Sequence, residues 1–203
     1  MRYVLTINTS LRRPFDFNAN HRVLDFVNTV NGRPVYSRDD LAGADDVFDW
    51  ADAAGLLRHH DQVKPRGDET SQFRAAIVLR ENLYLVFAPD SSSGETRKTA
   101  VAFVVRRAAL AARSARWDID ELRYEPWWPQ DTIDSICDRL ADQAVLLLRS
   151  AAMSRVGCCA GCGWLFLDTS RAHARRWCSM NACGVRDKMR RYHQRVAHET
   201  SVT

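Results

Sequence analysis

The chain has 203 residues, of which 29 are Lys or Arg and 25 are Asp or Glu, so its formal net charge is +4. This length suits one moderate hydrophobic core with a small appendage. No uninterrupted apolar run approaches the length that spans a bilayer, which excludes an integral membrane protein and leads us to expect a soluble one.

The first part of the chain carries the patterns of a mainly helical domain. Residues 3–8 alternate weakly, as an edge strand does, and residues 47–57 have a helical pattern that ends near Gly55. Residues 69–88 and 96–115 repeat the helical apolar period over a greater length, and a loop rich in serine separates them. We therefore predict two long helices joined by a loop.

The next segment changes its period twice. Residues 117–128 break the helical pattern and contain prolines, which indicates a short strand or hairpin. Residues 131–153 have the clearest helical period in the chain, so we expect a helix that packs centrally. Cys137 lies on the apolar stripe of that helix and is interpreted as a core residue. No internal repeat is visible.

Four cysteines near the C-terminus form two close pairs, Cys159 with Cys162 and Cys178 with Cys183. Two tight turns that each supply two thiolates are typical of a tetrahedral Zn²⁺ site. Residues 1–8 contain no secretory signal, so we expect a cytoplasmic protein whose thiols stay reduced. Four thiolates close the coordination sphere, and we therefore predict a structural zinc ion, not a catalytic one.

The neighbours of these cysteines raise further expectations. Cys158 adjoins Cys159 and could replace it as a ligand. We expect Trp164 and Phe166 to cover the metal site from opposite sides of a short strand, and Asp168 to cap a turn. Loss of any one ligand is expected to unfold this small module and to leave the helical domain folded, because metal binding and folding are coupled in such sites.

Positive charge is concentrated around the cysteines. Residues 155–195 hold nine Lys or Arg and two acidic residues, a net charge of +7, whereas the remainder holds 20 basic and 23 acidic residues. Such segregation indicates a polyanion as partner, and we expect double-stranded DNA. Arg175 and Arg176 have an alternative role, as salt-bridge partners of the acidic remainder.

A helical period runs through residues 184–196, after the last cysteine. We expect its apolar stripe, Val185, Met189, Tyr192 and Val196, to pack on the metal module while its cations face DNA. The candidate nucleic-acid contacts are Arg171, Arg175, Arg176, Arg186, Lys188, Arg190, Arg191 and Arg195.

Two parts of the chain resemble a known bacterial family. Residues 159–171, 175–180 (Arg-Arg-Trp-Cys-Ser-Met) and 183–186 (Cys-Gly-Val-Arg) are similar to the CGNR zinc finger. Residues 21–29 (His-Arg-Val-Leu-Asp-Phe-Val-Asn-Thr) resemble the N-terminal domain that accompanies this finger in bacterial regulators described as stress-induced. The resemblance implies a transcription regulator that has a DNA-binding finger and an N-terminal domain that senses a ligand or partner.

One residue departs from the family signature. The chain reads Cys-Gly-Val-Arg at residues 183–186, with Val185 where the family has Asn. An Asn side chain could cap a helix or bond to the backbone, and a Val side chain cannot. All four cysteines are kept, so we expect the metal site to survive while DNA contacts change.

Asp25, Asn28 and Thr29 are candidates for a ligand pocket in the N-terminal domain, although such residues also cap helices and close turns. We find no nucleophile and base at a recognisable spacing, so we do not expect an enzyme. The alternative to a DNA-binding regulator is a zinc-dependent module that binds RNA or protein. A single finger has a small footprint, which leads us to expect a homodimer.

The predicted fold class is α+β. Residues 1–153 are expected to form a mainly helical sensing or dimerisation domain with a small strand or hairpin element. Residues 154–203 are expected to form a zinc finger, of the treble-clef or ribbon kind, that ends in a basic helix.

Overall fold

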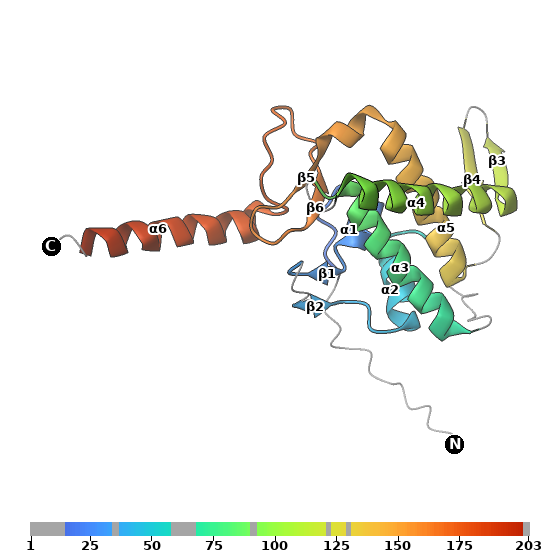
Figure 1. The fold of residues 1–203 in the computed structure, drawn as a ribbon, viewed down its shortest axis with the longest axis horizontal. Helices are drawn as coiled ribbons and strands as arrows, with labels where there is room; N and C mark the ends of the chain where they lie inside the picture. The colour runs from blue at the N-terminus through green and yellow to red at the C-terminus, as the bar shows by residue number, and fades with distance from the viewer. Residues whose placement is uncertain are drawn as a thin grey trace, which may run out of the picture.

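The computed structural model shows an α+β fold in which a mainly helical body carries a small C-terminal finger (Figure 1). The strand expected over residues 3–8 lies outside the described residues. Among the described helices, none is both long enough and apolar enough to cross a membrane. The structure describes residues 15–33, 37–57, 68–89, 93–120, 123–128 and 131–200.

Three long helices form the frame of the body. α3 (Glu69–Phe87), α4 (Gly94–Ser114) and α5 (Ile133–Arg149) pack against one another, and their apolar faces meet in the core. α1 (Arg22–Val27) and α2 (Ala44–Ala53) pack against this frame. Five of the six residues of α1 are buried, so this short helix lies deep inside the body.

Side-chain caps determine where the long helices begin. Asp68 caps α3, Ser93 caps α4 and Thr132 caps α5, each by accepting a hydrogen bond from a backbone N–H of the first turn. Gly55 follows α2 with a φ of 65°, a left-handed conformation that glycine adopts readily. The helices predicted over residues 69–88 and 96–115 are confirmed.

The helix predicted over residues 131–153 ends earlier than expected. Ser150 has extended backbone angles (φ −90°, ψ 156°), and the 3₁₀ helix η2 (Ala151–Arg155) follows it. The apolar period continued through this break because η2 also packs apolar side chains, Ala152 and Met153, against the core. Hydrophobic periodicity therefore did not reveal where the α-helix stops.

Short antiparallel strand pairs complete the body. β3 (Arg116–Asp120) and β4 (Arg123–Trp127) form the hairpin expected within residues 117–128. β1 (Val30–Asn31) pairs with β2 (Arg38–Asp39) near the finger. The buried guanidinium of Arg80 holds β2 in place by donating two hydrogen bonds to the Asp39 carboxylate, at 2.7 and 2.6 Å.

The finger begins with a hairpin and ends with a long helix. β5 (Val156–Cys158) pairs with β6 (Leu165–Leu167), and a loop then leads to the π-helical turn η3 (Met180–Gly184). α6 (Val185–Thr200) starts directly after η3 and points away from the body into solvent (Figure 1). This arrangement of hairpin, turn and helix agrees with the predicted finger.

The finger has its own small apolar cluster and packs against the core of the body through β6. Leu165 of β6 is fully buried among body residues. The indole N–H of Trp164 donates to the Val30 carbonyl at 3.1 Å, and the Leu167 N–H donates to the Ala19 carbonyl at 2.8 Å. The two predicted parts of the chain therefore pack against each other.

Candidate metal centre and nucleic-acid interface

The four cysteines that the sequence pairs meet in space. The sulfurs of Cys159, Cys162, Cys178 and Cys183 all lie within 4.8 Å of one another. Cys162 Sγ is 3.5 Å from Cys178 Sγ, which is 3.7 Å from Cys183 Sγ. Tetrahedral thiolates at a Zn–S distance of about 2.3 Å would be about 3.8 Å apart. The sulfurs therefore have the spacing of a four-thiolate metal site.

The first pair of sulfurs comes from the tight turn between β5 and β6. The Cys159 N–H donates to the Trp164 carbonyl at 2.7 Å, and the Gly163 N–H donates to the Cys159 carbonyl at 2.9 Å. Gly163 has a φ of 77°, which a residue with a side chain would adopt at a cost. Cys158 is exposed, with its sulfur 3.4 Å from the Gly163 carbonyl oxygen, and lies outside the cluster.

The second pair comes from the segment before α6. Cys178 precedes η3 and Cys183 lies within it, so the π-helical turn brings the last sulfur back over the first turn. A Cβ on Gly161 would lie 3.2 Å from the Cβ of Cys183, and one on Gly184 would lie 3.0 Å from the Met180 sulfur. Glycine at both positions allows this close approach.

The thiols of the cluster have strongly different pKa values because their sulfurs lie so close together. The pKa of Cys162 is lowered to about 5 because the adjacent Cys178 thiol donates a hydrogen bond to its sulfur. Burial raises the pKa of Cys183 to about 11. A cation bound among these sulfurs would replace the shared protons, as expected for thiolate ligands.

Trp164 and Phe166 lie on the same side of β6, not on opposite sides as predicted. Both pack with the four cysteines, while Leu165 between them points into the body. Residues two apart on a strand share a face, which is the physical reason for the correction. β6 thus presents one face to the metal site and the other to the core.

The loop between the two cysteine pairs is held by its own polar residues. The Asp168 carboxylate accepts hydrogen bonds from the N–H groups of Ser170 (2.8 Å) and Arg175 (3.0 Å). Hydrogen bonding, first of all from Ser170, lowers the pKa of Asp168 to about 2. Asp168 therefore closes a turn, in line with its expected capping role.

Arg175 has an internal role in this structure. Its guanidinium donates to the carbonyls of Asn18 and Cys178, both at 2.6 Å, and to that of Trp177 at 3.0 Å. It also lies over the Phe166 ring, 4.5 Å from the ring centroid. These contacts tie the loop to the body, so we leave Arg175 out of the nucleic-acid surface. Neither of the roles expected for it, a phosphate contact or a salt bridge, describes these contacts.

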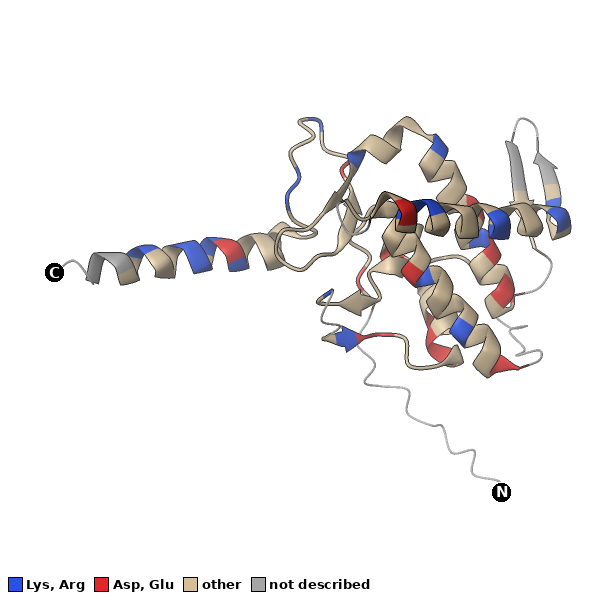
Figure 2. Cartoon of the chain, in the orientation of Figure 1, with Lys and Arg blue, Asp and Glu red and all other residues tan. Residues whose placement is uncertain are grey.

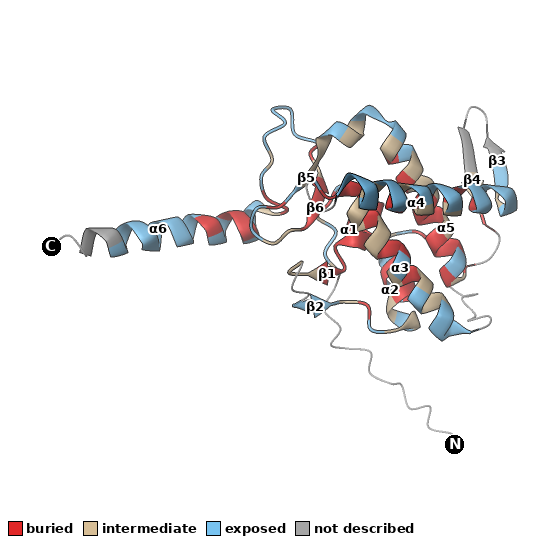
Figure 3. Cartoon of the chain, viewed as in Figure 1, coloured by how far each residue is buried: buried red, intermediate tan, exposed pale blue. Residues whose placement is uncertain are grey.

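The apolar stripe of α6 is exposed, contrary to the expectation that it packs on the metal module. Val185, Met189, Tyr192 and Val196 are between 42% and 52% exposed. Figure 3 shows α6 exposed along most of its length beyond the finger. The prediction failed because an amphipathic period identifies an apolar face without identifying what covers it.

Most cations of the finger and α6 are exposed. Lys and Arg predominate along α6, whereas the body carries both signs of charge (Figure 2). Among the α6 side chains that the structure describes, Asp187 is the acidic one; it is buried and accepts from Arg190 at 2.5 Å and from Arg191 at 2.9 Å. The hydrogen bond from Arg190 lowers the pKa of Asp187. The candidate contacts that are exposed are Arg171, Arg176, Arg186, Lys188, Arg190, Arg191 and Arg195.

The candidate ligand residues of the body are buried and have protein partners. Asn28 donates to the Leu165 carbonyl at 2.8 Å and accepts from the Leu165 N–H at 2.9 Å. Asp25 accepts from the Ala19 N–H at 2.9 Å, and Thr29 accepts from Arg80 at 3.1 Å. These contacts fit the alternative interpretation of local structure. Asn28 contacts the finger directly, whereas Asp25 and Thr29 contact other residues of the body.

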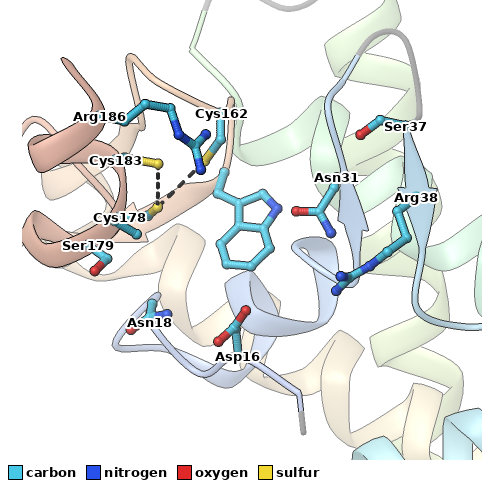
Figure 4. Close-up of a pocket in the computed structure, with 12 residues that line it drawn as sticks. Asp16, Asn18, Asn31, Ser37, Arg38, Cys162, Cys178, Ser179, Cys183 and Arg186 are labelled. Atoms are coloured by element: carbon cyan, nitrogen blue, oxygen red, sulfur yellow. Dashed lines mark hydrogen bonds between the residues drawn. The ribbon is translucent and has the colours of Figure 1, made fainter. Parts of the chain in front are cut away.

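A hollow that the sequence did not reveal lies between body and finger (Figure 4). It has a volume of about 620 Å³ and is open to solvent on one side. Arg38 reaches it from β2 and Arg186 from the first turn of α6 (Figure 4). Its residues come from distant parts of the chain, so no local motif could have identified it. The hollow adjoins the metal centre, since Cys162, Cys178 and Cys183 also line it. Its remaining polar lining residues are Asp16, Asn18, Asn31, Ser37 and Ser179.

Comparison with known proteins divides the chain in the same way. A family model described as the CGNR zinc finger matches residues 155–196. A second model, ABATE, described as a putative stress-induced transcription regulator, matches residues 20–152. Neither description is that of an enzyme family. No curated protein matches the chain.

Proposed function

Because the chain belongs to the ABATE family and ends in a CGNR zinc finger, we propose that it regulates transcription by binding double-stranded DNA through α6. The observation that carries the proposal is the position of this helix. α6 begins directly after the metal cluster and extends away from the body (Figure 1). Its Lys and Arg residues lie along this free part of the helix (Figure 2). Such a regulator would act in the cytoplasm, where bacterial DNA lies.

Zinc is the metal we propose for the site, held by Cys159, Cys162, Cys178 and Cys183. Four thiolates in tetrahedral spacing suit Zn²⁺, and its contribution when bound is structural. The η3 turn joins the cysteine cluster to α6 without a linker. The positions of the ligands therefore set the direction of the helix. A free helix of this length and composition would be marginal in water.

The hollow supports a sensing role for the body. Its walls come from both the body and the finger, and Arg186 of α6 is one of its lining residues. The side chains of Asn18, Asn31 and Ser179 line it without a hydrogen-bond partner within the described chain. A small polar effector bound there would contact the body and the first turn of α6 together. We infer that occupancy of this hollow would alter DNA binding.

The test is the affinity of the zinc-loaded full chain for duplexes selected from a random-sequence pool, measured across salt concentration. If Arg171, Arg176 and three cations of α6 each neutralise one phosphate, log K should fall with log salt with a slope of roughly −4 to −5. An enriched motif with such a slope would support the proposal, and an inverted repeat would add the expected dimer.

A charge-removal variant sharpens this test. Replacing Arg186, Lys188 and Arg195 by Gln should reduce the slope by about 3. The matched control replaces Arg106 and Arg113, which are exposed on α4, and should leave the slope unchanged. Binding that favours RNA, or that ignores salt, would contradict the proposal and favour an RNA- or protein-binding module.

A further inference from the structure

The exposed stripe of α6 is narrow and continuous. At about 100° per residue, Val185, Met189, Tyr192 and Val196 fall within about 60° of the helix circumference. Each is at least 42% exposed, although the finger and the body lie directly before this helix. A face of four apolar side chains held in solvent marks a contact surface.

Cations border this stripe on both sides. Arg186 lies on one flank, and Lys188 and Arg195 lie on the other, each roughly 90° from the centre of the stripe. None of the three has an ion pair within the described part of the chain. The two remaining arginines of α6 point farther back, where they pair with Asp187. The stripe therefore has available positive charge on both sides.

A second copy of the chain does not suit this surface. The stripe has the spacing of a coiled-coil seam, in which the flanks of one helix face the flanks of the other. Here the flanks carry Arg186, Lys188 and Arg195, with His193 beside them. Parallel or antiparallel pairing would place cation against cation. The partner of this face must therefore be negatively charged on both sides of an apolar strip.

The major groove of duplex DNA has that chemistry. Phosphates line both edges of the groove, and the 5-methyl groups of thymine are the apolar atoms on its floor. We propose that α6 enters the major groove with its stripe toward the base edges, and that this stripe recognises thymine methyl groups. The inference rests on the proposed DNA binding and adds the chemical feature of the sequence that is recognised.

The departure from the family signature supports this assignment. Val185 replaces the Asn of the Cys-Gly-Asn-Arg signature, and its side chain is 50% exposed as the first member of the stripe. An Asn there would offer hydrogen bonds to a base edge, whereas Val offers only apolar contact. The substitution therefore extends the apolar surface toward the finger.

The experiment compares one duplex made with thymine and the same duplex made with uracil, which removes only the 5-methyl groups. The duplex is the tightest one recovered from the random pool. The zinc-loaded chain should bind the uracil duplex about fourfold more weakly for each methyl group that the stripe buries. Equal affinity for the two duplexes would overturn the inference while leaving DNA binding intact. If the chain bound neither the thymine duplex nor the uracil duplex, the inference and the proposed function would both be overturned.

Two variants assign the effect to the stripe. Met189→Ala should bind the thymine duplex more weakly and lose most of its discrimination against uracil. Gln194→Ala, on the opposite side of α6, should discriminate as the wild type does. Full discrimination by Met189→Ala would overturn the inference. So would a dimer that forms without DNA and dissociates in Met189→Ala, because the stripe would then be covered by a second copy.

Discussion

At the residue scale, Asn28 joins the body to the finger with both ends of one amide. Its side chain donates to the carbonyl and accepts from the N–H of Leu165, so it occupies the place of a neighbouring strand. Both bonds are buried, which makes their loss expensive. The amide was a candidate ligand group in the sequence, and its partner, 137 residues away, could not be read from local patterns.

Asn28→Ala should therefore destabilise the whole protein. It leaves the N–H and the carbonyl of Leu165 without partners, at about 1–3 kcal/mol for each group. Chemical denaturation followed by near-UV circular dichroism would measure the loss. Asn31→Ala is the matched control, since that amide lines the hollow and has no hydrogen-bond partner among the residues that the structure describes. Equal stability of the two variants would show that the Asn28 bonds are unimportant.

Asp25 makes the stability depend on pH. Burial raises its pKa to about 6, against the usual value near 4, despite the hydrogen bond from Ala19 and the charge of Arg175. At a pH between these two pKa values, the Asp25 carboxyl is protonated in the folded protein and ionised in the unfolded chain. The contribution of this group to stability therefore falls as pH rises through that window.

Asp25→Asn should gain stability relative to the wild type as pH rises from about 4 to about 6, and the difference should then remain constant. The amide oxygen can still accept the hydrogen bond from Ala19, so the variant should fold. Urea denaturation of both proteins at several pH values measures the difference, which also cancels pH effects at the cysteines. A difference that does not change with pH would mean that Asp25 titrates normally.

At the scale of elements, α6 contributes little to the stability of the fold. The side chains of residues 189–197 are exposed, and the ion pairs of Asp187 are formed within the helix itself. Its charge and apolar face are therefore available to a partner. The sequence predicted the helix correctly, but its apolar period alone suggested a buried face.

Ending the chain after Arg191 should leave zinc content unchanged and the free energy of unfolding within about 0.5 kcal/mol. The truncation removes Tyr192, Arg195 and Val196 while keeping Asp187 with both its partners. Duplex affinity should fall. Calorimetry, zinc analysis and a binding titration measure these three quantities. Destabilisation well above that margin would show that the end of α6 packs on the protein.

At the scale of the whole molecule, the metal site supports more than the finger. β6 carries Trp164 and Phe166 toward the cysteines and Leu165 into the body, so the strand is common to both cores. Arg175 adds a hydrogen bond to the Asn18 carbonyl. The sequence led us to expect that the finger alone would unfold without its metal. Because of these contacts, we now expect the body to lose stability as well.

Cys178→Ser should lose zinc and also lower the stability of the body. Amide hydrogen exchange in α1 should speed up, because this helix packs against β6. Cys158→Ser is the control: its sulfur lies outside the cluster, so zinc content and exchange should match the wild type. Unchanged amide hydrogen exchange in α1 of zinc-free Cys178→Ser would show that the body folds independently of the finger.

The long helices and the hairpin could be predicted because each depends on neighbouring residues: an apolar period, a capping side chain, a proline or a glycine. The cysteine cluster could be predicted for the same reason, since two tight turns with the right spacing already bring pairs of thiols together. The basic composition around the cysteines was equally visible. By itself, the sequence determined the long helices, the β3–β4 hairpin, the cysteine cluster and the concentration of positive charge around it.

Tertiary structure alone decided what each polar or apolar group contacts. Arg175 donates a hydrogen bond to the body, and Asn28 bonds to the backbone of β6. The apolar stripe of α6 is exposed. The hollow formed from the segment before α1, the β1–β2 pair, the two cysteine turns and the first turn of α6. These outcomes depend on contacts between residues far apart in the chain, and such contacts are set by how the elements pack together. Periodicity and spacing carry no information about that packing.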